Sequence, residues 1–338
     1  MNTAKKPTLK DVARVAGTSV ATASVVLNQT PHKFVSEDLC RRVVEAAAQL
    51  HYRPNIPARR MRGKSGKFLA ILVPQFENVY FHRIVISAEN YANLRGYTLS
   101  IFSTYDEEEK ELKFIENLIS LQVDGVLISP AQYDSAAVAL LRTAGIPFVV
   151  IDRPINGTGY DLVTVDYFQG GYQGGQLLIG NGHRRVAFLG WQHGMKSITD
   201  RVRGFQAAMQ AAGIGPEEYL VWEGERSREA AYGITMRLLR ERKLTGLFAG
   251  HHQIAEGVVD ALRDLGLRVP GDISMVIFSN PPWASIITPR ITCVAQPDLA
   301  IGAKAAELIV DRLENRDHQS EAYILPVDVF TRESIRRV

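Results

Sequence analysis

The sequence is poor in cysteine and has no long hydrophobic run. Only Cys40 and Cys293 occur in 338 residues, too few for a disulfide framework, so we expect two reduced thiols. No stretch of about 18 apolar residues is present, which argues against a membrane-spanning helix. The opening MNTAKKPTLKD lacks the apolar segment of a secretory signal. We therefore expect a cytoplasmic protein without a membrane partner.

The sequence also lacks the short motifs of common enzyme classes. It has no GxGxxG or GxxxxGK[ST] phosphate loop at a strand end, no GxSxG elbow and no paired Cys/His site. The glycine-rich FQGGYQGGQLL has no phosphate-loop lysine, so we interpret it as a place of close helix packing. These absences argue against an enzyme, and we expect no cofactor.

Acidic residues are scarce at the amino end. The net formal charge is +3, yet residues 1–67 carry thirteen Lys or Arg against four Asp or Glu, and the remainder is mildly acidic. A basic segment joined to an acidic body is typical of a polyanion-binding module fused to another domain. A merely solvated basic tail is the alternative that charge alone leaves open.

Residues 8–51 have the pattern of three helices. Thr8 and Ser19 are suitable N-caps for two short segments that meet at AGTS, and Ser36 starts a third. Two helices joined by a tight turn and braced by a third form the helix-turn-helix plan, whose second helix enters the DNA major groove. A plain helical bundle has the same periodicity and stays open as an alternative. The basic segment 53–67, with two prolines and two glycines, predicts a linker.

Beyond Lys67, short apolar runs alternate with helical segments. FLAILVP, DGVLISP, RVAFLGW and ISMVIF are apolar on both faces, which is typical of buried parallel strands with crossover helices. VTVDYFQGG marks a break between two such halves, and the last strands, ITCVAQ and AYILPVDVF, could return to either half. The predicted fold class is an N-terminal all-α helix-turn-helix head plus an α/β core of two doubly wound parallel-sheet subdomains.

Six segments occur in this order: TLKDVARVAGTSVATASVVLN, YRPNIPARRMR, LQVDGVLISP, GIPFVVIDRP, GHRRVAFLG and LRDLGLRVPGDISMVIFS. Together they resemble the LacI/GalR (lactose-repressor) family over nearly all of residues 8–335. The resemblance implies a dimeric transcriptional regulator with a periplasmic-binding-protein-like core. It implies a DNA-binding domain over 8–54, a hinge helix or linker over 55–66, and an effector-binding and dimerisation core over 67–338. Within the core we expect one subdomain to comprise 67–164 and 293–325, and the other 165–292 and 326–338.

The resemblance assigns DNA contacts to the head and the hinge. The implied residues are Thr8, Ser19, Val20, Ala21, Thr22, Ser24, Val25, Asn28 and Tyr52 in the head, and Asn55, Arg59 and Met61 in the hinge. Met61 matches the position from which each subunit wedges an apolar side chain into the minor groove. Val25 departs from the family, in which Arg is common, so we expect an operator half-site that differs at the corresponding base pair.

The resemblance places the effector in the cleft between the two halves of the core. The implied contacts are Tyr80, Phe81, Asp152, Arg153, Arg201, Arg228, His251, His252, Ser279 and Gln296. GHHQIA stands where the family has A-N-D-x-x-A, and IFSN stands where it has GFDD, so acceptor carboxylates are lost and cationic donors are gained. Such a cleft suits a carboxylate or phosphate. We expect an anionic, carbohydrate-derived effector: a sugar acid, a keto-sugar acid or a sugar phosphate.

Three alternatives to an anionic effector that controls DNA binding stay open. The basic groups could instead pair with Asp152, Asp298 or Glu229. The protein could sense a neutral sugar, or it could bind a sugar without any role at DNA. An effector that releases DNA and an effector that promotes DNA binding are both compatible with the sequence.

The histidines of the sequence do not form the pattern of a metal site. Adjacent side chains such as His251 and His252 point to different sides of a chain, so we expect no metal site. His183 and Asp166 are interpreted as structural, with Asp166 orienting the turn into the following helix. The implied partners are a near-palindromic double-stranded DNA operator, a small effector and a second copy of the chain. A homodimer is expected because only RRV follows FTRESI.

Overall fold

The computed structural model describes residues 7–27, 35–52, 66–191, 194–315 and 319–338. They form two compact units, divided between Gly66 and Lys67. The small unit is the head, and the large unit is the core with its two sheets. None of the described helices has both the length and the apolar character that a bilayer crossing needs.

The head consists of three helices, as predicted. They are α1 (Leu9–Val15), α2 (Val20–Leu27) and α3 (Glu37–Gln49). The Thr8 backbone N–H donates to Asp11 at 2.9 Å, and Ser36 accepts from the Leu39 N–H, so both helix starts are capped. The packed centre uses small residues around Val12 and Val43, which lets the helices approach closely; they include Ala13, Ala16, Ala23 and Ala46.

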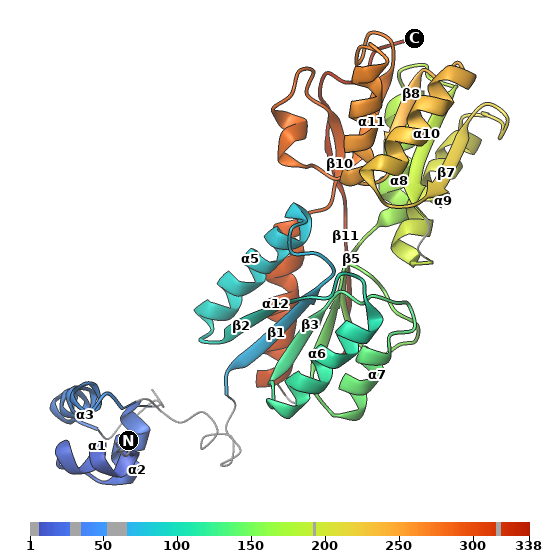
Figure 1. Ribbon diagram of the computed structural model, residues 1–338. Coiled ribbons are helices and arrows are strands. Elements are labelled where there is room, and N and C mark those ends of the chain that lie inside the picture. The colour runs from blue at the N-terminus through green and yellow to red at the C-terminus, as the bar shows by residue number, and fades with distance from the viewer. Residues whose placement is uncertain (1–6, 28–34, 53–65, 192–193, 316–318) are drawn as a thin grey trace, which may run out of the picture. The chain divides into compact units, whose positions relative to one another are not determined.

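The first lobe of the core has a six-stranded, fully parallel sheet in the order β11-β5-β4-β3-β1-β2. The strands are β1 (Phe68–Val73), β2 (Thr98–Ser103), β3 (Gly125–Ile128), β4 (Phe148–Ile151), β5 (Asp161–Val165) and β11 (Ala322–Leu325). Leu69 and Ile71 face α5 (Val79–Leu94) and α12 (Asp298–Glu314), whereas the alternate strand residues face α6 (Glu108–Ser120) and α7 (Ala136–Thr143) (Figure 1).

The second lobe repeats this plan with the order β12-β10-β9-β8-β6-β7. Its strands are β6 (Val186–Trp191), β7 (Leu220–Gly224), β8 (Gly246–Ala249), β9 (Ser274–Phe278), β10 (Thr292–Ala295) and β12 (Asp328–Phe330). Helices α8 (Tyr167–Ile179) and α9 (Lys196–Ala211) cover one face, and α10 (Arg228–Glu241) and α11 (His252–Asp264) cover the other. A short 3₁₀ helix, Pro282–Ser285, follows β9. The predicted fold class is confirmed, although the edge strand β12 runs antiparallel to β10.

The boundary predicted between the two halves is wrong at one strand. Residues 293–325 were expected in the first half, but β10 pairs in parallel with β9 of the second sheet. Of the described residues in that range, α12 and β11 are the elements that pack in the first lobe. The strand is apolar and buried on both faces, so its pattern fits either sheet and carries no information about its neighbours.

Glycines hold α8 and α9 in close contact, which confirms the interpretation of FQGGYQGGQLL. A Cβ atom on Gly171 would lie 2.0 Å from the Arg201 carbonyl oxygen, and one on Gly204 would lie 1.9 Å from the Phe168 carbonyl oxygen. Asp166 caps α8 by accepting from the Gln169 N–H at 2.8 Å, as predicted. This packing fixes the start of α8 relative to the arginine that α9 presents.

Candidate effector pocket and DNA-binding head

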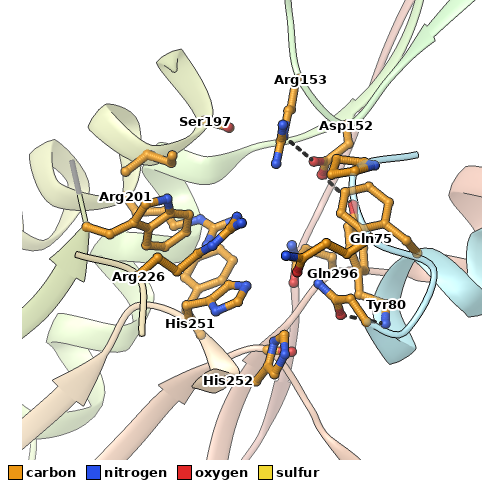
Figure 2. A pocket seen from close by; sticks show the side chains of 17 residues that line it. Gln75, Tyr80, Asp152, Arg153, Ser197, Arg201, Arg226, His251, His252 and Gln296 are labelled. Carbon is orange, nitrogen blue, oxygen red and sulfur yellow. Dashed lines mark hydrogen bonds and ion pairs between the residues drawn. The ribbon is translucent and has the colours of Figure 1, made fainter. Parts of the chain in front are cut away.

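A pocket with an empty volume of about 520 Å³ lies where the strands of both lobes end (Figure 2). Clefts at the carboxyl ends of parallel strands are the usual small-molecule sites of such folds. The structure brings nine of the ten predicted effector residues to its lining: Tyr80, Phe81, Asp152, Arg153, Arg201, His251, His252, Ser279 and Gln296. Each directly follows a strand or lies in the first turns of the helix after it.

Asp152 is held by two buried tyrosines. The hydroxyl of Tyr80 donates to Asp152 Oδ1 at 2.5 Å, and the hydroxyl of Tyr167 donates to the same oxygen. Burial, and then the charge of Asp152, raise the pKa of Tyr80 well above its usual value, so this hydroxyl stays a donor. The Asp152 backbone adopts a positive φ of 66°, which orients the carboxylate at the end of β4.

An ion-pair bridge joins the two lobes beside this carboxylate. Asp106, which follows β2, accepts from Arg153 Nη1 of its own lobe and from Arg226 Nη2 of the other lobe, the latter at 2.9 Å. Arg153 Nη1 also donates to the Pro130 carbonyl oxygen at 3.2 Å. Burial alone would raise the pKa of Asp106, but the two guanidinium groups outweigh it and the net pKa is lowered.

Arg201 stands in a cage of aromatic rings. Its guanidinium carbon lies 4.1 Å from the ring centre of Phe278, 4.7 Å from that of Tyr167 and 5.3 Å from that of Trp191. Its Nη1 donates to the Gly250 carbonyl oxygen at 2.9 Å. Arg201 Nε and Trp191 Nε1 are buried and find no hydrogen-bond partner among the described residues. Burial lowers the pKa of Arg201, but arginine starts so high that it stays charged.

The two histidines do not supply the positive charge that the sequence suggested. Burial, with help from nearby Arg226, lowers the pKa of His252 to about 4. Burial and then the neighbouring His252 and arginines lower the pKa of His251 well below its usual value. Both are neutral at pH 7. His251 Nδ1 accepts from the Gln253 N–H at 3.3 Å, which leaves the proton of the neutral ring on Nε2. The described residues contain no cluster of three His, Cys, Asp or Glu side chains suited to a metal.

Arg228 is the predicted effector residue that the structure places elsewhere. It begins α10, is 55% exposed and pairs with Asp260 on α11 at 2.5 Å. Arg226 lines the pocket instead. Ser227 caps α10 by accepting from the Ala230 N–H, so a residue before the cap stays at the strand end and one after it turns onto the helix surface. The cap in ERSREAAYG could therefore have identified Arg226.

Other lining residues also escaped the sequence analysis. They are Pro74, Gln75, Asn78, Trp191, Ser197, Ile198 and Phe278. The ion pairs proposed as an alternative do not occur among the described residues, since Arg228 pairs with Asp260 and the partners of Asp152 and Asp298 are other arginines. Arg153 lies 3.8 Å from Asp152, whereas Asp298 pairs with Arg83.

In the head, the predicted DNA-contacting residues differ in exposure, and two of them cap helices. Val20 and Ala21 are exposed at the start of α2, and Thr22, Ser24, Val25 and Tyr52 are half-buried. Ser19 and Thr8 are exposed cap residues: Ser19 accepts from the Thr22 N–H at 3.0 Å, and Thr8 donates to Asp11. Asn28, Asn55, Arg59 and Met61 lie outside the described residues.

The comparisons with known proteins agree with this geometry. The family described as bacterial regulatory proteins, lacI family, matches residues 8–55, and a periplasmic binding protein-like domain matches residues 176–335. The HTH-type transcriptional repressor PurR of Actinobacillus pleuropneumoniae serotype 3 (strain JL03) is 31% identical over 98% of this chain and 99% of its own length.

Solved structures give the same result for the fold. A complex of the transcriptional regulator CelR with cellobiose is 28% identical, with a TM-score of 0.74 over 97% of this chain and 99% of that one. The lac repressor dimer bound to operator and the anti-inducer ONPF is 24% identical, with a TM-score of 0.84 over 98% and 100%. The chain belongs to the lacI family of bacterial regulatory proteins and is a DNA-binding transcriptional regulator.

Proposed function

We propose that the chain is a homodimeric, cytoplasmic repressor acting at the nucleoid, whose operator affinity is set by a small anionic effector derived from a carbohydrate. The effector is a sugar acid, a keto-sugar acid or a sugar phosphate. The observation that carries this proposal is the set of three arginines, Arg153, Arg201 and Arg226, that line one pocket. Guanidinium groups bind carboxylates and phosphates through paired donors, and partial burial strengthens that interaction.

Unpartnered donors support the same ligand chemistry. Arg201 Nε and Trp191 Nε1 are buried against the pocket without a partner among the described residues. A buried donor without an acceptor is costly, by about 1–3 kcal/mol, so such groups are normally satisfied by a ligand or by water. The oxygens of an acid and its hydroxyls are suitable acceptors.

For DNA, we propose that two heads read the two half-sites of a near-palindromic operator. The exposed start of α2, with Val20 and Ala21, is the segment that faces the major groove. We assign residues 8–54 to DNA binding, 55–66 to a hinge and 67–338 to effector binding and dimerisation. In this scheme Met61 is the minor-groove wedge, and Met61→Gly weakens operator binding by more than tenfold.

Effector control follows from the pocket's position between two lobes. A ligand that contacts both lobes favours one angle between them, and this angle sets the separation of the two hinges in a dimer. Such coupling is typically about 1–3 kcal/mol, which changes operator affinity about 5- to 150-fold. The ligand acts only through its different affinities for the two lobe arrangements.

Thermal unfolding of the full chain tests the effector class. Sugar acids and sugar phosphates should raise the melting temperature, and cellobiose and ribose should not. A ligand at a hundred times its Kd stabilises a protein by about 2.7 kcal/mol. Arg226→Gln should abolish the shift, and Arg228→Gln, the matched control two residues away and outside the lining, should retain it. Stabilisation by neutral sugars alone would identify a neutral-sugar regulator and contradict the proposal.

Retention on operator DNA tests the other half. Binding should fall steeply as salt rises, because each phosphate contact releases counterions. A chain that binds sugar acids yet ignores every duplex in dilute buffer would be a sugar-binding protein without a DNA role.

A further inference from the structure

Asp106 joins arginines from both lobes, and no sequence pattern pointed to it. Its carboxylate accepts from Arg153 on one side and from Arg226 on the other, across 120 residues of sequence in the second case. The Asp106 side chain is only 11% exposed, so water screens the bridge weakly. The bridge thus places a carboxylate against two of the three arginines that line the pocket, although Asp106 itself is not a lining residue.

The backbone around Asp106 is held in an unusual conformation. Tyr105 and Asp106 are two successive residues with positive φ, 57° and 62°. Residues other than glycine rarely adopt a positive φ. Non-glycine residues with a positive φ cluster at functional sites, where the surrounding structure maintains the conformation. The turn therefore holds the carboxylate at the pocket rather than leaving it in solvent.

The bridge lies on the side of the core opposite to the chain crossings. The chain passes between the lobes after β5, after β10 and after β11, all at or next to one edge of each sheet. Asp106 follows β2 and Arg226 precedes α10 just after β7, and β2 and β7 are the opposite edge strands. The Asp106–Arg226 pair consequently connects the lobes at their free edges.

The bridge sets the formal charge of the pocket. Arg153, Arg201 and Arg226 are balanced by the carboxylates of Asp106 and Asp152, so one positive charge remains. Asp152 is already occupied by two tyrosine hydroxyls. A ligand with one negative charge would leave the pocket neutral, and a ligand with two would leave an uncompensated charge in a poorly solvated site.

We propose that Asp106 is the specificity-determining residue of this pocket and restricts the effector to monoanions, the sugar acids and keto-sugar acids, over dianionic sugar phosphates. The inference rests on the proposed anionic-effector function and narrows it. Removing the Asp106 charge leaves room for a second negative charge on the ligand. At about 5 Å and an effective dielectric constant of about 20, one such charge corresponds to a change of up to about 250-fold in relative affinity.

Acetate and sulfate are suitable probes, because they present one and two charges without stereochemical demands. Their Kd values are measured by thermal unfolding of the full chain at constant ionic strength and pH 6. At this pH Glu111, which interacts electrostatically with Arg153 and Asp106 and has a pKa of about 7, is mostly protonated. His252, with a pKa of about 4, is neutral. The comparison is between wild type, Asp106→Asn and Asp272→Asn, the last a control at an exposed ion pair with Arg268.

Wild type and Asp272→Asn should prefer acetate, and Asp106→Asn should shift the ratio of affinities toward sulfate by at least tenfold. Asp106→Ser is the second variant if Asp106→Asn does not fold, and Arg226→Gln should remove binding of both probes. An unchanged ratio, with both probes still lost in Arg226→Gln, would overturn the role of Asp106 and leave the anionic-effector proposal standing. Binding that is absent, or indifferent to Arg226→Gln, would overturn both.

Discussion

Glu111 gives a quantitative test of how burial controls charge in this core. It lies on α6 and is 1% exposed; its oxygens accept from the Ala131 N–H at 2.8 Å and from the Ser135 hydroxyl at 3.1 Å. Burial raises its pKa from 4.5 to about 7, and the two donors offset this only in part. Between these values the folded chain holds a proton that the unfolded chain has released. Its stability therefore falls as pH rises from about 4.5 to 7, by about 3 kcal/mol.

Glu111→Gln should remove this dependence while keeping the contacts. The Gln amide oxygen accepts from Ala131, and its NH₂ donates to the Ser135 hydroxyl oxygen. In urea unfolding at pH 5 and pH 8, the variant should gain about 2–3 kcal/mol over wild type between the two conditions. Titrations elsewhere, such as that of His252, cancel in this difference. Glu116→Gln, at an exposed position of the same helix, is the control and should gain nothing. A difference between Glu111→Gln and wild type that stays constant across this range would refute the reasoning.

Three further predictions concern packing, DNA reading and a buried histidine. Gly204→Ala should lower the free energy of unfolding by about 1–3 kcal/mol or more, because the added Cβ would lie 1.9 Å from the α8 backbone. Gly233→Ala in α10 is the control: its Cβ would meet nothing within 4 Å, so it should be neutral or stabilising. Thermal unfolding of the two variants compares them. Val25→Arg should change the base selected at one position of each half-site, read by sequencing bound duplexes from a random pool, and an unchanged consensus would contradict the placement of α2 in the groove. His183→Leu should cost about 1–3 kcal/mol in urea unfolding, because the ring contacts a threonine hydroxyl at 2.9 Å and a backbone carbonyl at 3.0 Å; a loss below about 0.5 kcal/mol would show that these contacts do not stabilise the fold.

The sequence predicted local structure well, because local structure depends on neighbouring residues. The capping residues Ser36 and Asp166 precede the first residues of their helices, and the apolar segments that were predicted as strands form strands. Strand partnership is not local. β10 is buried on both faces and would fit either sheet, and only the crossings that precede and follow it decide its place.

In the pocket, too, positions set by local structure were predicted and contacts between distant residues were not. Residues that come directly after strands, such as Asp152 and Ser279, were predicted from the family resemblance. The structure brings them to one lining because the carboxyl ends of parallel strands meet at one edge. Asp106 also follows a strand, but its role depends on Arg226, 120 residues away, and no short-range pattern links the two.

The charge of the pocket shows why residue types alone mislead. The sequence suggested that His251, His252 and Arg228 add positive charge, yet burial neutralises both histidines and Arg228 faces Asp260 outside the lining. Each of these results depends on what surrounds the side chain, since a buried imidazole loses its proton and an exposed guanidinium finds a surface partner. The case for an anionic ligand therefore rests on arginines held in low dielectric, where an uncompensated positive charge attracts an anion much more strongly than it would in water.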